Sequence, residues 1–136
     1  MNRLVSTRAI SWIAATILSL SGCAVFEALG GMPRKSDELA VRQNTSTSHV
    51  FACVEQAISS LNTNWDRRIT KRDEPAGVIE TGNYSKSNIA GFRVRATHVR
   101  SENILEIELK GAGPYYVDIG VDEGMQNLKA ELKECL

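Results

Sequence analysis

Two neighbouring stretches in which apolar and polar residues alternate restrict the fold of this chain more than any other feature. The first is Ala90–Val99, whose apolar or inward-facing set is Ala90, Phe92, Val94, Ala96 and His98. The second is Ile104–Lys110, with the set Leu105, Ile107 and Leu109. Alternation with a period of two is typical of a β-strand with one buried face. With a turn at Arg100–Asn103, the pattern predicts an antiparallel hairpin covered on one side.

The polar positions of this hairpin carry opposite charges. We expect Arg93 and Arg95 to lie near Glu106 and Glu108 on the exposed face. Exposed cross-strand ion pairs contribute a few tenths of a kcal/mol each and help to fix the register of the strands. We therefore interpret them as structural pairs and not as a binding site.

Amphipathic helices are predicted on both sides of the strands. Ser48 is a plausible N-cap for the first helix. Its apolar stripe is Val50, Val54, Ala57, Ile58 and Leu61. Asp122 can cap a second helix near the C-terminus, with Gly124 weakening its first turn. The stripe of that helix is Met125, Leu128, Leu132 and Cys135.

Further strands complete the sheet. Trp65–Arg72 predicts a strand with Trp65 and Ile69 on one face, and an Asp-Glu-Pro-Ala-Gly turn leads from it to a strand at Val78–Gly82. Tyr115–Ile119 is a candidate for a short last strand. The predicted domain is residues 48–136, of the α+β class. It is a two-layer sandwich in which an antiparallel sheet of four or five strands has the N-terminal and C-terminal helices packed on one face.

The first residues have the order of an export signal. Arg3 and Arg8 precede an apolar stretch, Ala9–Leu20, which is shorter than the roughly 20 residues needed to cross a bilayer. Leu20-Ser21-Gly22-Cys23 follows and resembles the lipobox of bacterial membrane lipoproteins. An ordinary secretory signal or a short membrane anchor are the alternatives for this leader.

The resemblance implies that residues 1–22 are a signal peptide removed before Cys23, which then carries lipid and holds the chain on a membrane. Several acyl chains together give stable attachment. Ala24 stands where such lipoproteins tend to carry Asp when they are kept in the inner membrane. The resemblance therefore implies the periplasmic face of the outer membrane.

Residues 23–47 show little periodicity and end in a run of Ser and Thr. Gly30-Gly31 and Pro33 would break a helix. We interpret the stretch as a flexible, lipid-bearing tether, with a short amphipathic helix across Ser36–Arg42 as the alternative.

The chain has three cysteines, and lipid on Cys23 would leave an even pair. An exported chain meets an oxidising compartment, so we predict a disulfide between Cys53 and Cys135 that ties the two helices together. Two buried free thiols are the alternative, because sequence spacing does not fix geometry.

The sequence contains few features that indicate catalysis or ligand binding. The 136 residues hold 16 basic and 16 acidic side chains, so no concentrated basic surface for nucleic acid is indicated. His49 and His98 lack recognisable catalytic partners, and no metal, phosphate-loop or nucleophile motif occurs. Tyr84, Tyr115 and Tyr116 can line a recognition surface or pack in the core. We expect a non-enzymatic protein without catalytic, cofactor-binding or metal-binding residues.

The order of elements after residue 48 is similar to that of small envelope lipoprotein domains, including the helix-grip domains of outer-membrane assembly lipoproteins. Only the segment Ala76–Thr81 is similar to these domains in amino-acid sequence, so no functional residue is carried over. The sequence favours a lipid-anchored protein that binds or helps to assemble another protein of the cell envelope. The alternative is an inhibitor or immunity lipoprotein that acts on a periplasmic toxin or lysozyme, and an enzyme of unfamiliar type is the third possibility.

Overall fold

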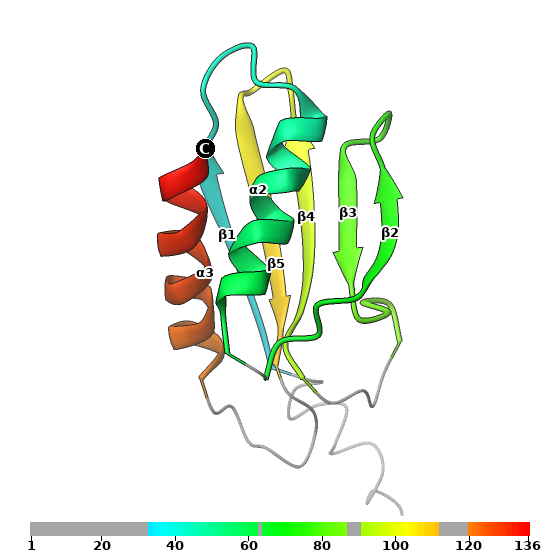
Figure 1. Ribbon diagram of the computed structural model, residues 1–136, viewed down its shortest axis with the longest axis vertical. Coiled ribbons are helices and arrows are strands. Elements are labelled where there is room, and N and C mark those ends of the chain that lie inside the picture. The colour runs from blue at the N-terminus through cyan, green and yellow to red at the C-terminus, as the bar shows by residue number, and fades with distance from the viewer. Residues whose placement is uncertain (1–32, 63, 87–90, 112–119) are drawn as a thin grey trace, which may run out of the picture. The chain divides into compact units, whose positions relative to one another are not determined.

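A computed structural model describes residues 33–62, 64–86, 91–111 and 120–136 of the chain. The predicted leader, Cys23 and the candidate strand Tyr115–Ile119 lie outside these described residues. All described residues belong to one compact unit that begins at Met32. Its elements in chain order are β1 (Arg34–Ala40), α2 (Thr47–Ser60), β2 (Ile69–Asp73), β3 (Val78–Thr81), β4 (Arg93–Val99), β5 (Ile104–Lys110) and α3 (Val121–Cys135) (Figure 1).

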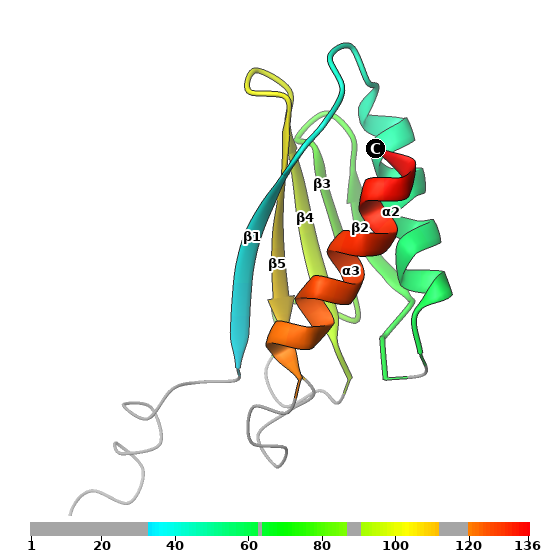
Figure 2. The same ribbon diagram turned by 90° about the vertical axis from the view of Figure 1, so that its left-hand side faces the viewer.

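The five strands form one antiparallel sheet in the order β1-β5-β4-β3-β2. Both helices cover the same face, so the unit is the two-layer α+β sandwich that the sequence predicts (Figure 2). The predicted hairpin is confirmed as β4–β5, with Val94 opposite Leu109 and Ala96 opposite Ile107. These four side chains are fully buried beneath the helices.

The tether prediction is wrong for residues 34–40. These residues form β1, which pairs with β5 from Arg34 opposite Lys110 to Ala40 opposite Ile104. The short helix considered for this stretch is equally wrong. Apolar alternation is almost absent here because Leu39 is the only buried residue of the strand.

Ion pairs replace apolar contacts along the rest of β1. The Lys35 Nζ lies 2.7 Å from a carboxylate oxygen of Asp122, and the Lys129 Nζ lies 2.5 Å from one of Asp37. Both partners belong to α3, so β1 is attached to that helix by charge as well as by Leu39. A charged strand of this kind carries no hydrophobic periodicity for a sequence reading to detect.

The helices begin at other residues than predicted. Ser46, and not Ser48, caps α2, and its Oγ accepts a hydrogen bond from the His49 N–H at 3.2 Å. Gly120 occupies the N-cap position of α3 in the left-handed region, at φ +91°, and offers no side-chain cap. Asp122 stands in the first turn of α3, where its charge favours the positive end of the helix dipole.

The helix stripes are confirmed in their central parts. The buried members are Val50, Val54, Ala57 and Ile58 of α2 and Met125, Leu128 and Leu132 of α3. Gly124 also has a packing reason. A Cβ at this position would meet a Leu109 methyl at 3.2 Å and the Phe92 ring at 3.5 Å. The glycine therefore lets α3 lie close against the sheet.

Strand β2 is shorter than predicted, and its first residues leave the ladder. Trp65 is buried, forms an isolated bridge with Phe92, and has its ring centroid 5.0 Å from the Phe92 ring. Ile69 is 39% exposed whereas Trp65 is buried, so the prediction that Trp65 and Ile69 lie on one face of a strand is wrong. Residues 66–68 are not part of β2, so a regular strand alternation does not run from Trp65 to Ile69.

If β1 is part of the domain, truncating its one buried side chain must destabilise the whole unit. We expect Leu39→Ala to lower the free energy of unfolding by about 2–4 kcal/mol, as for other buried leucines. Glu38→Ala, one residue away on the exposed side of the strand, should change it by about 0.5 kcal/mol or less. Urea unfolding followed by circular dichroism measures both. Equal, negligible effects would mean that residues 34–40 are a tether after all.

Candidate functional site

The predicted disulfide pair is the first candidate site, and the structure brings its members together. Cys53 in α2 and Cys135 at the end of α3 have their sulfur atoms 1.96 Å apart and their Cα atoms 5.6 Å apart. Cys53 is fully buried, whereas Cys135 is partly exposed. The two helices are therefore joined across a sequence separation of 82 residues. Cys23, the predicted lipid site, lies outside the described residues.

Two further side chains surround this pair. His49 lies one helical turn before Cys53, and its Nε2 is 3.5 Å from the Cys53 Sγ. Arg42, just after β1, donates through Nε to the Leu136 carbonyl at 2.6 Å and through Nη2 to the Cys135 carbonyl at 3.3 Å. The guanidinium thus binds the carbonyl end of α3, where a positive charge is favourable.

His98, the second histidine of the sequence, lies on the inward face of β4 as predicted and is 5% exposed. Its Nδ1 is 3.1 Å from the Thr47 Oγ1, to which Arg100 Nε also donates at 2.8 Å. Burial, and secondarily the charge of Arg100, lowers the pKa of His98 below its usual value near 6.5. These contacts join the start of α2 to β4, so His98 has a structural place in the fold.

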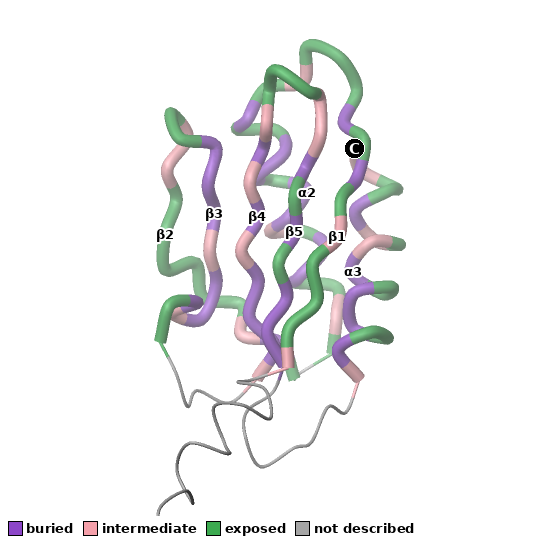
Figure 3. Tube along the Cα trace, turned by 180° about the vertical axis from the view of Figure 1, so that it is seen from behind, coloured by how far each residue is buried: buried purple, intermediate pink, exposed green. Residues whose placement is uncertain are grey.

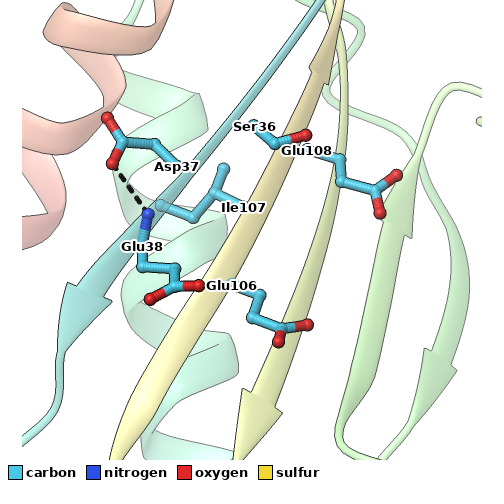
Figure 4. A pocket seen from close by; sticks show the side chains of 6 residues that line it. All are labelled: Ser36, Asp37, Glu38, Glu106, Ile107 and Glu108. Atoms are coloured by element: carbon cyan, nitrogen blue, oxygen red, sulfur yellow. Dashed lines mark hydrogen bonds between the residues drawn. The ribbon is translucent and has the colours of Figure 1, made fainter.

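The face of the sheet away from the helices is a second candidate site, because neither helix covers it (Figure 3). An open pocket of about 370 Å³ lies on this face over β1 and β5. Its lining residues are Ser36, Asp37, Glu38, Glu106, Ile107 and Glu108 (Figure 4). Because it is open and lined by strands rather than loops, it suits an extended or flat partner better than a small enclosed ligand.

The charges in this pocket have one sign. Glu38 stands directly opposite Glu106 in the β1–β5 ladder, and Ser36 stands opposite Glu108. Like charges directly opposite one another on a sheet are unfavourable. No ion pair involves Glu38 or Glu106 within the part of the chain that the structure describes. We call Glu38, Glu106 and Glu108 the acidic strip.

The predicted exposed ion pairs of the hairpin are wrong in detail. Arg93 is fully buried and stands opposite Lys110, not opposite a glutamate. Its Nη1 donates to the Asn83 carbonyl at 3.4 Å and to the Lys86 carbonyl at 2.6 Å. Arg95 stands opposite Glu108, but its ion pair is with Glu80 of β3, at 3.4 Å.

The cause is the segment 82–86, which follows β3 and covers one end of the open face. Tyr84 is buried there and donates its hydroxyl to Glu108 at 2.7 Å. Lys110 donates its Nζ to the Tyr84 carbonyl at 2.5 Å and lies 4.1 Å from the centre of the Tyr84 ring. Strand alternation alone does not indicate that another segment of the chain covers a polar face.

The pKa values of both Tyr84 and Lys110 are shifted from their usual values. Burial, followed by the neighbouring Glu108 carboxylate, raises the pKa of Tyr84. Burial, followed by the charges of Arg34 and Arg93, lowers the pKa of Lys110. The tyrosine therefore stays protonated and donates to Glu108 under ordinary conditions. Of the three tyrosines proposed for a recognition surface, Tyr84 packs at its rim, and Tyr115 and Tyr116 lie outside the described residues.

Comparisons with known proteins add no assignment. The sequence matches no protein family, and no curated protein matches it. Among the described residues, no helix is long and apolar enough to cross a membrane.

Sequence reasoning missed two of these features. The acidic strip is not found from the sequence because a tether over residues 23–47 gives Glu38 no cross-strand neighbour. The approach of His49 to the cysteines left a usable signal, since His49 and Cys53 have the i, i+4 spacing of one helix face.

A pH dependence of stability follows from His98. Its folded-state pKa lies below its unfolded value near 6.5, so the unfolded chain binds the proton first as the pH falls. The stabilisation is present above the unfolded pKa and is lost as the pH falls through the lowered folded-state pKa. We expect the free energy of unfolding to decrease between about pH 7 and pH 5, and His98→Gln to flatten this decrease. His49→Gln, which leaves His98 in place, is the matched control for urea titrations at each pH.

Proposed function

We propose that this chain is a lipid-anchored, non-enzymatic protein of the cell envelope that binds another envelope protein through the open face of its sheet. The leader and lipobox ending at Cys23 support the anchor. Ala24 supports the periplasmic face of the outer membrane as its place. The observation that carries the binding role is the uncovered sheet face with its acidic strip.

The position of β1 brings the proposed anchor closer to the domain than the sequence suggested. Only residues 24–33 separate Cys23 from Arg34, the first residue of β1. A segment of that length spans at most roughly 35 Å when fully extended. A lipid on Cys23 would therefore keep the domain, and its open face, near the membrane surface.

Electrostatics indicates what kind of partner suits the face. The fold has placed Glu38 opposite Glu106, although this like-charge pair is unfavourable to the isolated sheet. A partner segment with Lys or Arg side chains would relieve the repulsion, and such complementarity mainly improves association rate and specificity. The proposed partner is thus a protein segment with basic side chains that can lie along β1 and β5.

An inhibitor or immunity role is the alternative within the same class of binding proteins. It uses the same face, since a small disulfide-joined domain can present the acidic strip to a basic enzyme or toxin. The identity of the protein captured on the strip distinguishes the two roles, as does a toxin gene beside this one.

The anchor is tested first by changing the lipid site. We expect the native chain to fractionate with membranes and Cys23→Ser to appear in the soluble periplasmic fraction, because the sulfur that receives the lipid is gone. Mass spectrometry of the membrane-bound chain should show acyl chains on a new N-terminal Cys23. Cys53→Ser serves as the control, since it removes a different cysteine and should remain with membranes. Retention of Cys23→Ser in the membrane fraction would rule out the lipid anchor.

The open face is tested by site-specific photocrosslinking in intact cells. We expect a photoreactive amino acid at Glu106 to capture an envelope protein, and Glu38→Lys to weaken that capture because it reverses a charge of the strip. The matched control is the same amino acid at Lys133, an exposed position of α3. Identical capture from both positions, or none from Glu106, would contradict binding through the open face.

A further inference from the structure

Three side chains of the kinds that bind thiophilic metal ions meet where α2 and α3 are joined. His49 and Cys53 lie one turn apart on α2, and Cys135 comes from the last turn of α3. Their ligand atoms all lie within 4.8 Å of one another. Within the described part of the chain, no other set of His, Cys, Asp and Glu gathers as closely.

The distances agree with a tetrahedral site. Zinc holds sulfur at about 2.3 Å and imidazole nitrogen at about 2.0–2.1 Å, which places neighbouring nitrogen and sulfur ligands roughly 3.5 Å apart. The His49 Nε2 and the Cys53 Sγ are already 3.5 Å apart. On reduction the two sulfur atoms would have to separate to roughly 3.8 Å, and the ligand atoms of His49 and Cys135 already lie within 4.8 Å of each other.

The surroundings of the three residues allow this separation and give an ion a way in. Cys53 is held inside the core, whereas Cys135 is partly exposed at the end of its helix and His49 is exposed. The end of α3 is kept in place by the hydrogen bonds from Arg42 to the carbonyls of Cys135 and Leu136. A small movement of the Cys135 side chain therefore suffices, and an ion reaches the site from the solvent side.

We propose that His49, Cys53 and Cys135 bind one Zn²⁺ ion when the disulfide is reduced, so that the disulfide and the metal exclude each other. A thiol reductant supplies two electrons and two protons to the S–S bond and becomes a disulfide itself. Zn²⁺ then replaces the two thiol protons, which are released to water, and the neutral imidazole of His49 completes three ligands. The fourth position is open to water.

The donor set decides the class of ion. Thiolate and imidazole favour zinc and similar soft or borderline ions, whereas magnesium and calcium require oxygen ligands. In the oxidised chain the sulfur atoms have no thiolate to offer, so the same residues should bind no zinc. The proposal does not depend on lipid attachment or on a protein partner.

The experiment compares the oxidised and the reduced chain. The Cys23→Ser chain, which lacks the third thiol, is purified and reduced with a phosphine under nitrogen, and Co²⁺ is then added as a spectroscopic probe. We expect one equivalent to bind with thiolate-to-cobalt charge-transfer bands and the visible bands of a tetrahedral site, and Zn²⁺ to displace it. The oxidised chain should give no such bands. His49→Ala should weaken the reduced chain's affinity for zinc by at least about tenfold, whereas Ser48→Ala, on the exposed side of the same helix turn, should not.

A second measurement covers the case in which reduction loosens the fold. Circular dichroism of the reduced chain should show a higher melting temperature with Zn²⁺ than with a chelator, and the increase should be lost in His49→Ala. The proposal is overturned if the reduced chain gives no thiolate bands and no stabilisation by zinc. It is equally overturned if the oxidised chain binds cobalt as tightly, or if His49→Ala binds like the native chain.

Discussion

Strand β5 is hydrogen-bonded along both edges, and the rest of the domain depends on this double pairing. One partner, β4, precedes it directly, and the other, β1, comes from the beginning of the described chain. On the covered face β5 contributes Leu105, Ile107 and Leu109, all of them fully buried. On the other face it contributes Glu106 and Glu108. The same strand therefore carries the centre of the core and the centre of the proposed binding surface.

Helix α3 and β1 lie side by side and are joined by side-chain contacts at several positions along their length. Lys35 pairs with Asp122 near the start of both elements, and Asp37 pairs with Lys129 farther along. Arg42 reaches the end of α3 just beyond the end of β1. Because the salt bridges are exposed or only partly buried, each contributes little, and Leu39 with the β5 ladder must contribute more. The Cys53–Cys135 bond adds a covalent link to α2, which also contacts α3 through side-chain packing and through a hydrogen bond from the Ser60 hydroxyl to a Glu131 carboxylate oxygen at 2.7 Å.

The sequence predicts those helices and strands whose buried residues recur with a regular apolar period. The β4–β5 hairpin and the central parts of both helix stripes follow from apolar periodicity, and the structure confirms them. Strand β1 could not be found in this way because Lys35 and Asp37 face α3 where apolar residues would normally stand. Arg93 has the parity of an exposed residue and is buried because segment 82–86 covers it. Periodicity describes a strand and its own faces, but it does not describe what another segment places on them.

The candidate sites also combine features that the sequence predicts with features that it does not. The disulfide could be predicted because cysteine pairing follows from the predicted compartment and from the helix stripe on which Cys135 lies. The acidic strip could not be predicted, because it joins Glu38 to Glu106 through a strand pairing that the sequence does not reveal. The i, i+4 spacing of His49 and Cys53 predicts that they share one face of a helix. It does not predict the three-residue cluster, because Cys135 is brought beside them only by the packing of α3.

The two candidate sites lie at different places in the domain. Since Lys35 meets Asp122 and Arg42 meets Leu136, β1 and α3 run in the same direction, and the cysteines lie near the end of the sheet opposite Arg34. The acidic strip runs between the two ends along the length of β1 and β5. A partner lying on the strip would thus leave the cysteine cluster uncovered, and the two activities proposed here need not compete for the same surface.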